Sequence, residues 1–224
     1  MAPKLIFALD TIRVNQVSLA RRTILGGVDI IEVGTPLIKI SGLKIVELLH
    51  KKYPNVPIYA DLKVMDFPEM EVIDFFEAGA LFVSIMAFAN NNTILKAFEL
   101  AKSYDRKIFV SLMGYPECEL KKRVKELSKL GTEYIIAHGS GEPEDAFRDT
   151  LRKIKLVHQI DDVKLIAAGG INESNIDSIL RYHPKIIIIG RGISMQEDIT
   201  SAVMRVKEKI LNYQNSESGD HYVV

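Results

Sequence analysis

Residues 25–33 read LGGVDIIEV, a leucine and two glycines followed by a short apolar run. Glycine often follows the last turn of a helix, because it adopts the left-handed conformation that ends many helices. The run after it is rich in β-branched residues and too short for a helix, which is typical of a buried strand. The stretch therefore predicts the end of a helix, a tight turn and a buried strand.

The same order recurs in EAGALFVSI (77–85) and LGTEYIIAH (130–138). Eight short apolar runs are candidate strands, at residues 4–10, 29–33, 56–62, 81–86, 107–112, 133–138, 164–169 and 185–190. Amphipathic stretches lie between them; in 117–131 one stripe carries Leu120, Val124, Leu127 and Leu130. Regular alternation of strands and helices predicts parallel strands covered by helices.

Eight such units without a break in composition predict an α/β fold, a single (β/α)₈ TIM barrel over residues 1–212. A doubly wound open sheet is the rival fold. The first loop, ALDTIRVNQ (8–16), contains no glycine, so the dinucleotide fingerprint that would favour this rival is missing. Residues 213–224 lose helical periodicity and are expected to form a mobile tail.

The composition argues against several classes of partner. Lys+Arg and Asp+Glu are both 29, so no overall basic field favours nucleic acid or an anionic membrane. The one cysteine, Cys118, excludes an intrachain disulfide and a multi-cysteine metal site. The start, MAPKLIFALD, turns acidic too soon for a signal peptide, and no apolar run is long enough to span a bilayer. We therefore expect a soluble, cytoplasmic protein.

Polar residues and glycines collect where the predicted strands end, at the rim that carries the active site in barrels of this type. They are Asp10, Glu32, Asp61, Lys63, His138, Gly169, Gly170, Gly190 and Arg191. A single aspartate there is more often a helix cap, and a single histidine is about as often structural as catalytic. Their joint placement on one rim favours a functional site.

The segment YADLKVMDFP (59–68) places a lysine among acids at the end of the third strand. Side chains two apart on a strand share a face, so Asp61 and Lys63 should point the same way, with Asp66 in the loop beyond. Flanking carboxylates favour the ammonium form of Lys63, which argues against a Schiff-base lysine. Lys63 is thus predicted to be a fixed charge or proton donor facing an anionic intermediate. The alternative is a structural ion-pair cluster.

Glu32 and Asp61 come from adjacent strands and could share a cation. Oxygen ligands without cysteine suit Mg²⁺ better than zinc. The alternative is that Glu32 pairs with a lysine across the barrel mouth.

The last two loops, AAGGINESNI (167–176) and IIGRGISMQEDI (188–199), place glycines where backbone N–H groups can approach an anion. Barrels of this type often bind phosphate there, and Arg191 adds a bidentate cation. A phosphorylated substrate is therefore expected.

Taken together, these segments resemble the orotidine 5′-monophosphate decarboxylase superfamily, through the Asp-x-Lys-x-x-Asp pattern of DLKVMD. The chain is more narrowly similar to the branch of 3-hexulose-6-phosphate synthase and 3-keto-L-gulonate-6-phosphate decarboxylase. The supporting segments, in family order from residue 7 to about 193, are FALD, IIEVGTPLI, YADLKVMD, EAGALFVSI, YIIAHGS, AAGGI and GRGI.

The resemblance implies a role for each rim residue. Glu32 and Asp61 would be Mg²⁺ ligands, Lys63 would stabilise an enediolate, and His138 would shuttle protons. Asp66 would reach the neighbouring subunit's site across a homodimer interface. The substrate phosphate would lie on Gly170, Gly190 and Arg191, and Asp10 would contact the sugar.

Two positions depart from the family pattern. Ser111 stands where relatives commonly carry an acid, and Gly141 stands where the decarboxylase typically has an arginine. The leading expectation is a Mg²⁺-dependent lyase, an aldolase that joins formaldehyde to ribulose 5-phosphate or runs the reverse cleavage. Keto-gulonate-phosphate decarboxylase is the first alternative. Orotidine decarboxylase, whose lysine is replaced here by Glu32, a ribulose-phosphate epimerase and a non-catalytic phosphosugar-binding barrel follow.

Overall fold

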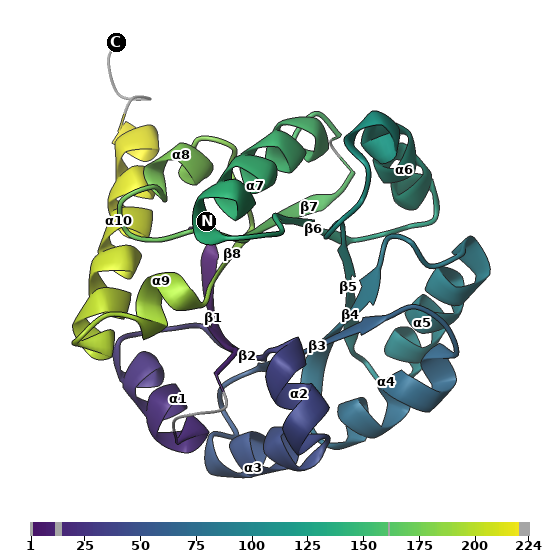
Figure 1. The fold of residues 1–224 in the computed structure, drawn as a ribbon, viewed down its shortest axis with the longest axis horizontal. Coiled ribbons are helices and arrows are strands. Elements are labelled where there is room, and N and C mark those ends of the chain that lie inside the picture. Colours follow the sequence, from purple (N-terminus) through teal and green to yellow (C-terminus); the bar gives the residue numbers. More distant parts are fainter. Residues whose placement is uncertain (1, 12–14, 161, 220–224) are drawn as a thin grey trace.

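The apolar runs form eight parallel strands that close into one barrel, with β1 pairing both β2 and β8 (Figure 1). This computed structural model describes residues 2–11, 15–160 and 162–219. The strands are β1 (Lys4–Leu9), β2 (Ile30–Val33), β3 (Ile58–Val64), β4 (Ala80–Met86), β5 (Lys107–Ser111), β6 (Tyr134–His138), β7 (Lys164–Ala168) and β8 (Ile186–Ile189). The predicted TIM barrel is confirmed.

The helices surround the barrel as an outer ring (Figure 1). They are α1 (Gln16–Leu25), α2 (Thr35–Ser41), α3 (Lys44–Lys52), α4 (Pro68–Glu77), α5 (Asn91–Ser103), α6 (Glu117–Lys129), α7 (Pro143–Val157), α8 (Asp177–Leu180), α9 (Arg191–Ser194) and α10 (Ile199–Gly219). Within the described part of the chain, no helix is both long and apolar enough to cross a membrane.

Two apolar layers hold the barrel together. One fills its interior and includes Tyr59, Phe82 and Phe109, whose rings pack at centroid distances of 4.7–4.9 Å. The larger layer lies between the strands and the helices. Strands buried on both faces need apolar side chains at nearly every position, which explains why they appear as continuous runs.

The C-terminal boundary differs from the expectation. Helix α10 continues to Gly219, so the predicted loss of helix after residue 212 is wrong over seven residues. Residues 220–224, the end of the predicted mobile tail, lie outside the described residues.

Strand β3 is irregular where it enters the rim. Its register against β4 shifts between Ala60 and Val64, and Lys63 has a φ of 54°. A left-handed conformation is rare for a residue with a side chain, and such strain is found mostly at functional sites. Strand alternation therefore predicted correctly that Lys63 and Asp61 lie together, although the backbone at Lys63 does not have regular strand geometry.

Candidate active site

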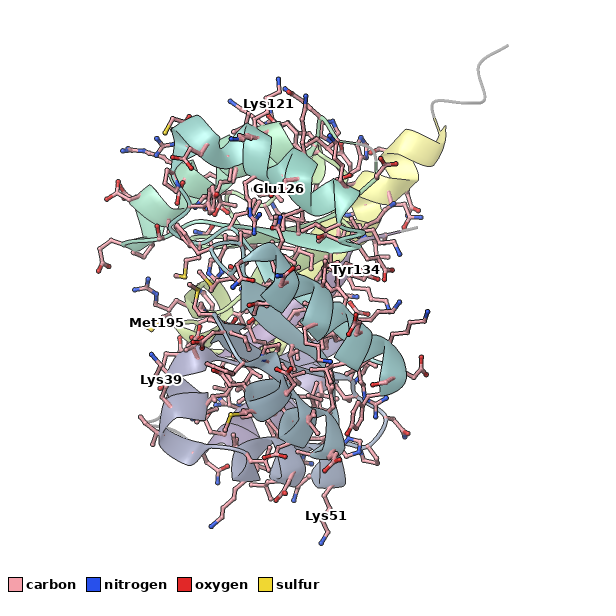
Figure 2. All side chains as sticks on the ribbon, turned by 90° about the vertical axis from the view of Figure 1, so that its right-hand side faces the viewer. Lys39, Lys51, Lys121, Glu126, Tyr134 and Met195 are labelled. Atoms are coloured by element: carbon pink, nitrogen blue, oxygen red, sulfur yellow. The ribbon has the colours of Figure 1, made fainter. Side chains whose placement is uncertain are left out.

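A pocket of about 730 Å³ opens at the ends of the strands where their carboxyl termini meet. Met195, labelled in Figure 2, follows α9 and lines the mouth at this end. The pocket brings together nearly all the predicted site residues, namely Asp10, Glu32, Asp61, Lys63, His138, Gly170, Gly190 and Arg191. Asp66 is the exception, because it lies exposed in the loop after β3 and does not line the pocket.

Asp61 is buried and lies at the centre of a hydrogen-bond network. Its Oδ1 accepts hydrogen bonds from Tyr59 Oη at 2.9 Å and Ser84 Oγ at 2.6 Å. Its Oδ2 accepts from Lys63 Nζ and from Thr35 Oγ1. Although burial opposes ionisation, Lys63 and these donors hold the pKa of Asp61 below its ordinary value. Asp61 is therefore a fixed anion at neutral pH.

Sequence reasoning missed Thr35, Tyr59 and Ser84. Thr35 Oγ1 accepts a hydrogen bond from Lys63 Nζ at 2.7 Å, and Ser84 Oγ accepts one from the Lys63 backbone N–H at 2.9 Å. A signal was present, since Tyr59 and Ser84 are polar groups inside apolar runs, and buried polar groups need partners. Their shared partner, Asp61, lies on β3 two positions from Tyr59 but 23 positions from Ser84.

Glu32 is buried next to Asp61, and its Oε2 has no hydrogen-bond partner among the residues that the structure describes. Burial, and then the charges of Asp61 and Asp10, raise the pKa of Glu32 well above its ordinary value. The predicted alternative, a lysine paired with Glu32, would have satisfied this oxygen. A buried carboxylate that lacks a partner beside a second carboxylate is suited to share a cation with it.

Glu32 and Asp61 are the protein groups that could hold such a cation. Among the described residues, no three His, Cys, Asp or Glu side chains come together as a metal site. A cation bound here would therefore take its remaining ligands from water and substrate oxygens, which suits Mg²⁺.

Asp10 lies between two glycines at the pocket wall. A Cβ at Gly34 would lie 2.1 Å from Asp10 Oδ1, and a Cβ at Gly190 would lie 2.7 Å from its Oδ2. A side chain at either position would therefore displace the Asp10 carboxylate. Burial, and then the charge of Asp61, raise the pKa of Asp10. The carboxyl is placed to accept or donate a hydrogen bond within the pocket.

His138 ends β6 inside the pocket. Burial lowers the pKa of His138 to about 4; the charge of Asp61 opposes this shift, and the charge of Lys63 adds to it. The ring is therefore neutral at pH 7. Its Nδ1 lies 3.5 Å from Ser111 Oγ, so the position where relatives carry an acid holds a neutral hydroxyl here.

The opposite end of the pocket is suited to an anion. Gly169 and Gly170 have φ of +103° and +67°, a conformation that favours glycine. A Cβ at Gly170 would lie 2.2 Å from Pro143 O, so the loop packs directly on α7. The Arg191 side chain is 59% exposed, and its Nη1 lies 3.7 Å from the Glu142 carboxylate, a long contact. Its guanidinium is thus available for a ligand.

The loop that carries Asp66 is apolar and exposed on its outer side. Met65, Phe67 and Met70 are 47%, 68% and 79% exposed. This surface adjoins the site residues of β3 without forming part of the pocket.

Comparison with known proteins identifies the family of the chain. The family model described as "Orotidine 5'-phosphate decarboxylase / HUMPS family" matches residues 3–206. A 3-hexulose-6-phosphate synthase of Staphylococcus haemolyticus is 31% identical over 206 residues, covering 91% of this chain and 96% of the relative. One from Bacillus subtilis is 26% identical, covering 91% and 97%.

Solved structures give the same result. A crystal structure of 3-hexulose-6-phosphate synthase has a TM-score of 0.81 at 28% identity, covering 91% of this chain and 98% of that one. A 3-keto-L-gulonate-6-phosphate decarboxylase from Vibrio cholerae has a TM-score of 0.78 at 26% identity, covering 95% and 99%. With the family model matched over most of its length, the chain belongs to the orotidine 5′-phosphate decarboxylase / HUMPS family.

Proposed function

We propose that this chain is a Mg²⁺-dependent aldehyde-lyase that acts on a ketose phosphate, namely a 3-hexulose-6-phosphate synthase. It would join formaldehyde to ribulose 5-phosphate, or cleave the product. One observation carries the proposal: a single pocket contains a carboxylate pair with a lysine at one end and glycine loops with Arg191 at the other. The named relatives support the same substrate class.

Glu32 and Asp61 would hold the metal, and the unpartnered Oε2 of Glu32 supports this assignment. When bound, Mg²⁺ supplies positive charge to neighbouring oxygens of an enediolate. Lys63 offsets the remaining negative charge from a position fixed by Thr35 and Asp61. Arg191 and the glycine loops bind the phosphate and so orient the reacting carbons.

The reaction needs one proton removed and one returned. A proton leaves carbon 1 of ribulose 5-phosphate, that carbon forms a bond to the carbonyl carbon of formaldehyde, and the aldehyde oxygen gains a proton. His138, neutral at pH 7, has a ring nitrogen free to accept the first proton and to return it to the new hydroxyl. Buried surroundings favour return of the ring to its neutral form.

The decarboxylation of 3-keto-L-gulonate 6-phosphate is the second candidate, because it passes through an equivalent enediolate. Its substrate carries a carboxylate in addition to the phosphate. Among the described residues, the lysine and arginine side chains that line the pocket are Lys63 and Arg191. Gly141, where the decarboxylase typically has arginine, has a φ of +103°, which an arginine would adopt only with strain. These features favour the synthase.

A homodimer would complete the site. Asp66 lies outside its own pocket, on the exposed apolar loop that contains Met65, Phe67 and Met70. Pairing two such loops would bury these side chains and could bring Asp66 to the partner's pocket. The protein would then act in the cytoplasm as a dimer without nucleic acid or membrane partners.

A substrate panel with and without chelator tests the function. Loss of formaldehyde with ribulose 5-phosphate would support the synthase, and CO₂ release from keto-gulonate phosphate would support the decarboxylase. Activity should disappear with EDTA and return with Mg²⁺ or Mn²⁺. Full activity in metal-free protein would exclude the metal role, and no turnover with any member would favour a phosphosugar-binding barrel.

A further inference from the structure

A lysine is buried on the inner face of α7, away from the pocket. The Lys153 side chain is 3% exposed, and its Nζ donates hydrogen bonds to the His138 carbonyl oxygen and to Asp149 Oδ2, both at 2.8 Å. Burying an ammonium group is unfavourable, and an apolar side chain of similar volume is often at least as stable in such a place. Stability alone is therefore a weak reason for a lysine here.

Asp149 links Lys153 to the residues that follow His138 in the loop between β6 and α7. Its Oδ2 also accepts hydrogen bonds from the Ser140 backbone N–H at 3.1 Å and from Ser140 Oγ at 3.3 Å. The Lys153–Asp149 pair thus holds the chain on both sides of Gly139, directly after the strand that carries His138.

Among the described residues, the hydrogen-bond contact of the His138 ring is with Ser111. Its contact with Ser111 Oγ, at 3.5 Å, is at the outer limit of a hydrogen bond. The ring position therefore depends strongly on the backbone from which it projects. That backbone is held at the His138 carbonyl by Lys153.

Helix α7 supports the phosphate end of the pocket through a different residue. Thr150 is fully buried; its Oγ1 accepts a hydrogen bond from the Gly139 N–H and lies 2.7 Å from Ala168 O and 2.9 Å from Gly169 O. The same helix face thus contacts both loops: Lys153 and Asp149 contact the β6–α7 loop, whereas Thr150 links that loop at Gly139 to the end of β7 and the loop after it.

We propose that Lys153 and Asp149 are positioning residues that set His138 for proton transfer, whereas Thr150 supports the phosphate loop. The assignment rests on the proposed role of His138. Misplacing a reacting group by about 1 Å can lower a rate by about 100-fold. Loss of the pair should therefore lower kcat and leave binding of the phosphate group nearly unchanged.

The experiment compares Lys153→Met with Lys155→Met, an exposed lysine two residues along the same helix. Lys153→Met should lower kcat by about 10-fold or more and change KM by less than about twofold. Affinity for inorganic phosphate should stay at the wild-type value, and the NMR signals of the His138 ring should shift. Lys155→Met should change none of these, while Thr150→Val should mainly weaken phosphate binding.

A second pair of variants covers the case in which Lys153→Met does not fold. Asp149 is 25% exposed, so its replacement should be tolerated. Asp149→Asn keeps an acceptor for Ser140 and Lys153 and should retain most of kcat, whereas Asp149→Leu should not. An equal loss of kcat in Asp149→Asn and Asp149→Leu would overturn the proposal. A folded Lys153→Met protein whose His138 ring signals are unchanged would also overturn it. The NMR signals of the His138 ring test the positioning role even if the protein turns over no substrate. Lack of turnover would refute only the proposed function.

Discussion

Replacing Glu32 by glutamine keeps the shape of the side chain and removes a buried charge. Within the described part of the chain, no group forms a hydrogen bond with Glu32 Oε2, and the carboxyl lies near the acidic side chains of Asp61 and Asp10. We therefore expect Glu32→Gln to stabilise the metal-free protein, although it damages the site. If replacing an active-site residue increases stability, the wild-type side chain lowers the free energy of unfolding in return for activity.

The size of the effect follows from the charge, because a glutamine amide in the same place would also lack a partner but would be neutral; leaving a buried group unsatisfied costs about 1–3 kcal/mol, and more when the group is charged. We expect the free energy of unfolding to rise by about 2 kcal/mol in metal-free Glu32→Gln at neutral pH. For a chain of this length, that corresponds to an increase in Tm of about 4–8 °C.

The effect should depend on pH in a defined direction. The pKa of Glu32 is raised in the folded protein above the ordinary glutamate value of 4.5. Its favourable contribution is therefore complete below 4.5 and is lost as the pH rises through the folded-state pKa. The advantage of Glu32→Gln over wild type should grow as the pH increases across that window. Asp61, whose pKa is lowered, acts in the opposite direction at acid pH but is common to both proteins.

Thermal unfolding of chelator-treated protein, repeated with Mg²⁺, is the assay. A cation at 100 times its Kd should add about 2.7 kcal/mol to wild type and much less to Glu32→Gln. The difference in stability between Glu32→Gln and wild type should therefore become smaller or change sign when metal is added. A metal-free Glu32→Gln protein that is less stable than wild type, and is equally stabilised by Mg²⁺, would refute the reasoning.

Three further predictions concern the other charged groups. Arg191→Ala should lower kcat/KM for the phosphorylated sugar by about 100-fold, because it removes a bidentate phosphate contact; an unchanged kcat/KM would place the phosphate elsewhere. Asp66→Asn and Lys63→Ala should each be inactive, and mixing them after mild dissociation should restore about a quarter of wild-type activity if the dimer has independent shared sites. No recovery despite verified subunit exchange would contradict a shared site. Because the pKa of His138 is lowered to about 4, kcat should show no histidine ionisation between about pH 6 and 8. An inflection near pH 6.5 that follows His138 in NMR titration would refute this assignment.

The sequence alone was sufficient for the barrel and for most of the pocket lining. Strand runs and the glycines that end helices are local signals, and a closed parallel barrel brings the carboxyl ends of all its strands to one rim. Residues at those ends, such as Glu32 and His138, could therefore be grouped before any contact was known. The end of α10 was missed because its last turns, up to Gly219, lack a strong apolar stripe.

Tertiary structure decided which groups hold these residues in place. Ser84 reaches Asp61 from 23 positions away, and Lys153 reaches the His138 carbonyl from the outer ring of helices. The unpartnered oxygen of Glu32 and the left-handed backbone of Lys63 likewise have no local signature. Hydrogen bonding and desolvation depend on distances between segments far apart in the chain, whereas the hydrophobic period depends only on neighbours along it. Sequence patterns could therefore predict where the site lies, and only the folded chain could define the electrostatic environment of its residues.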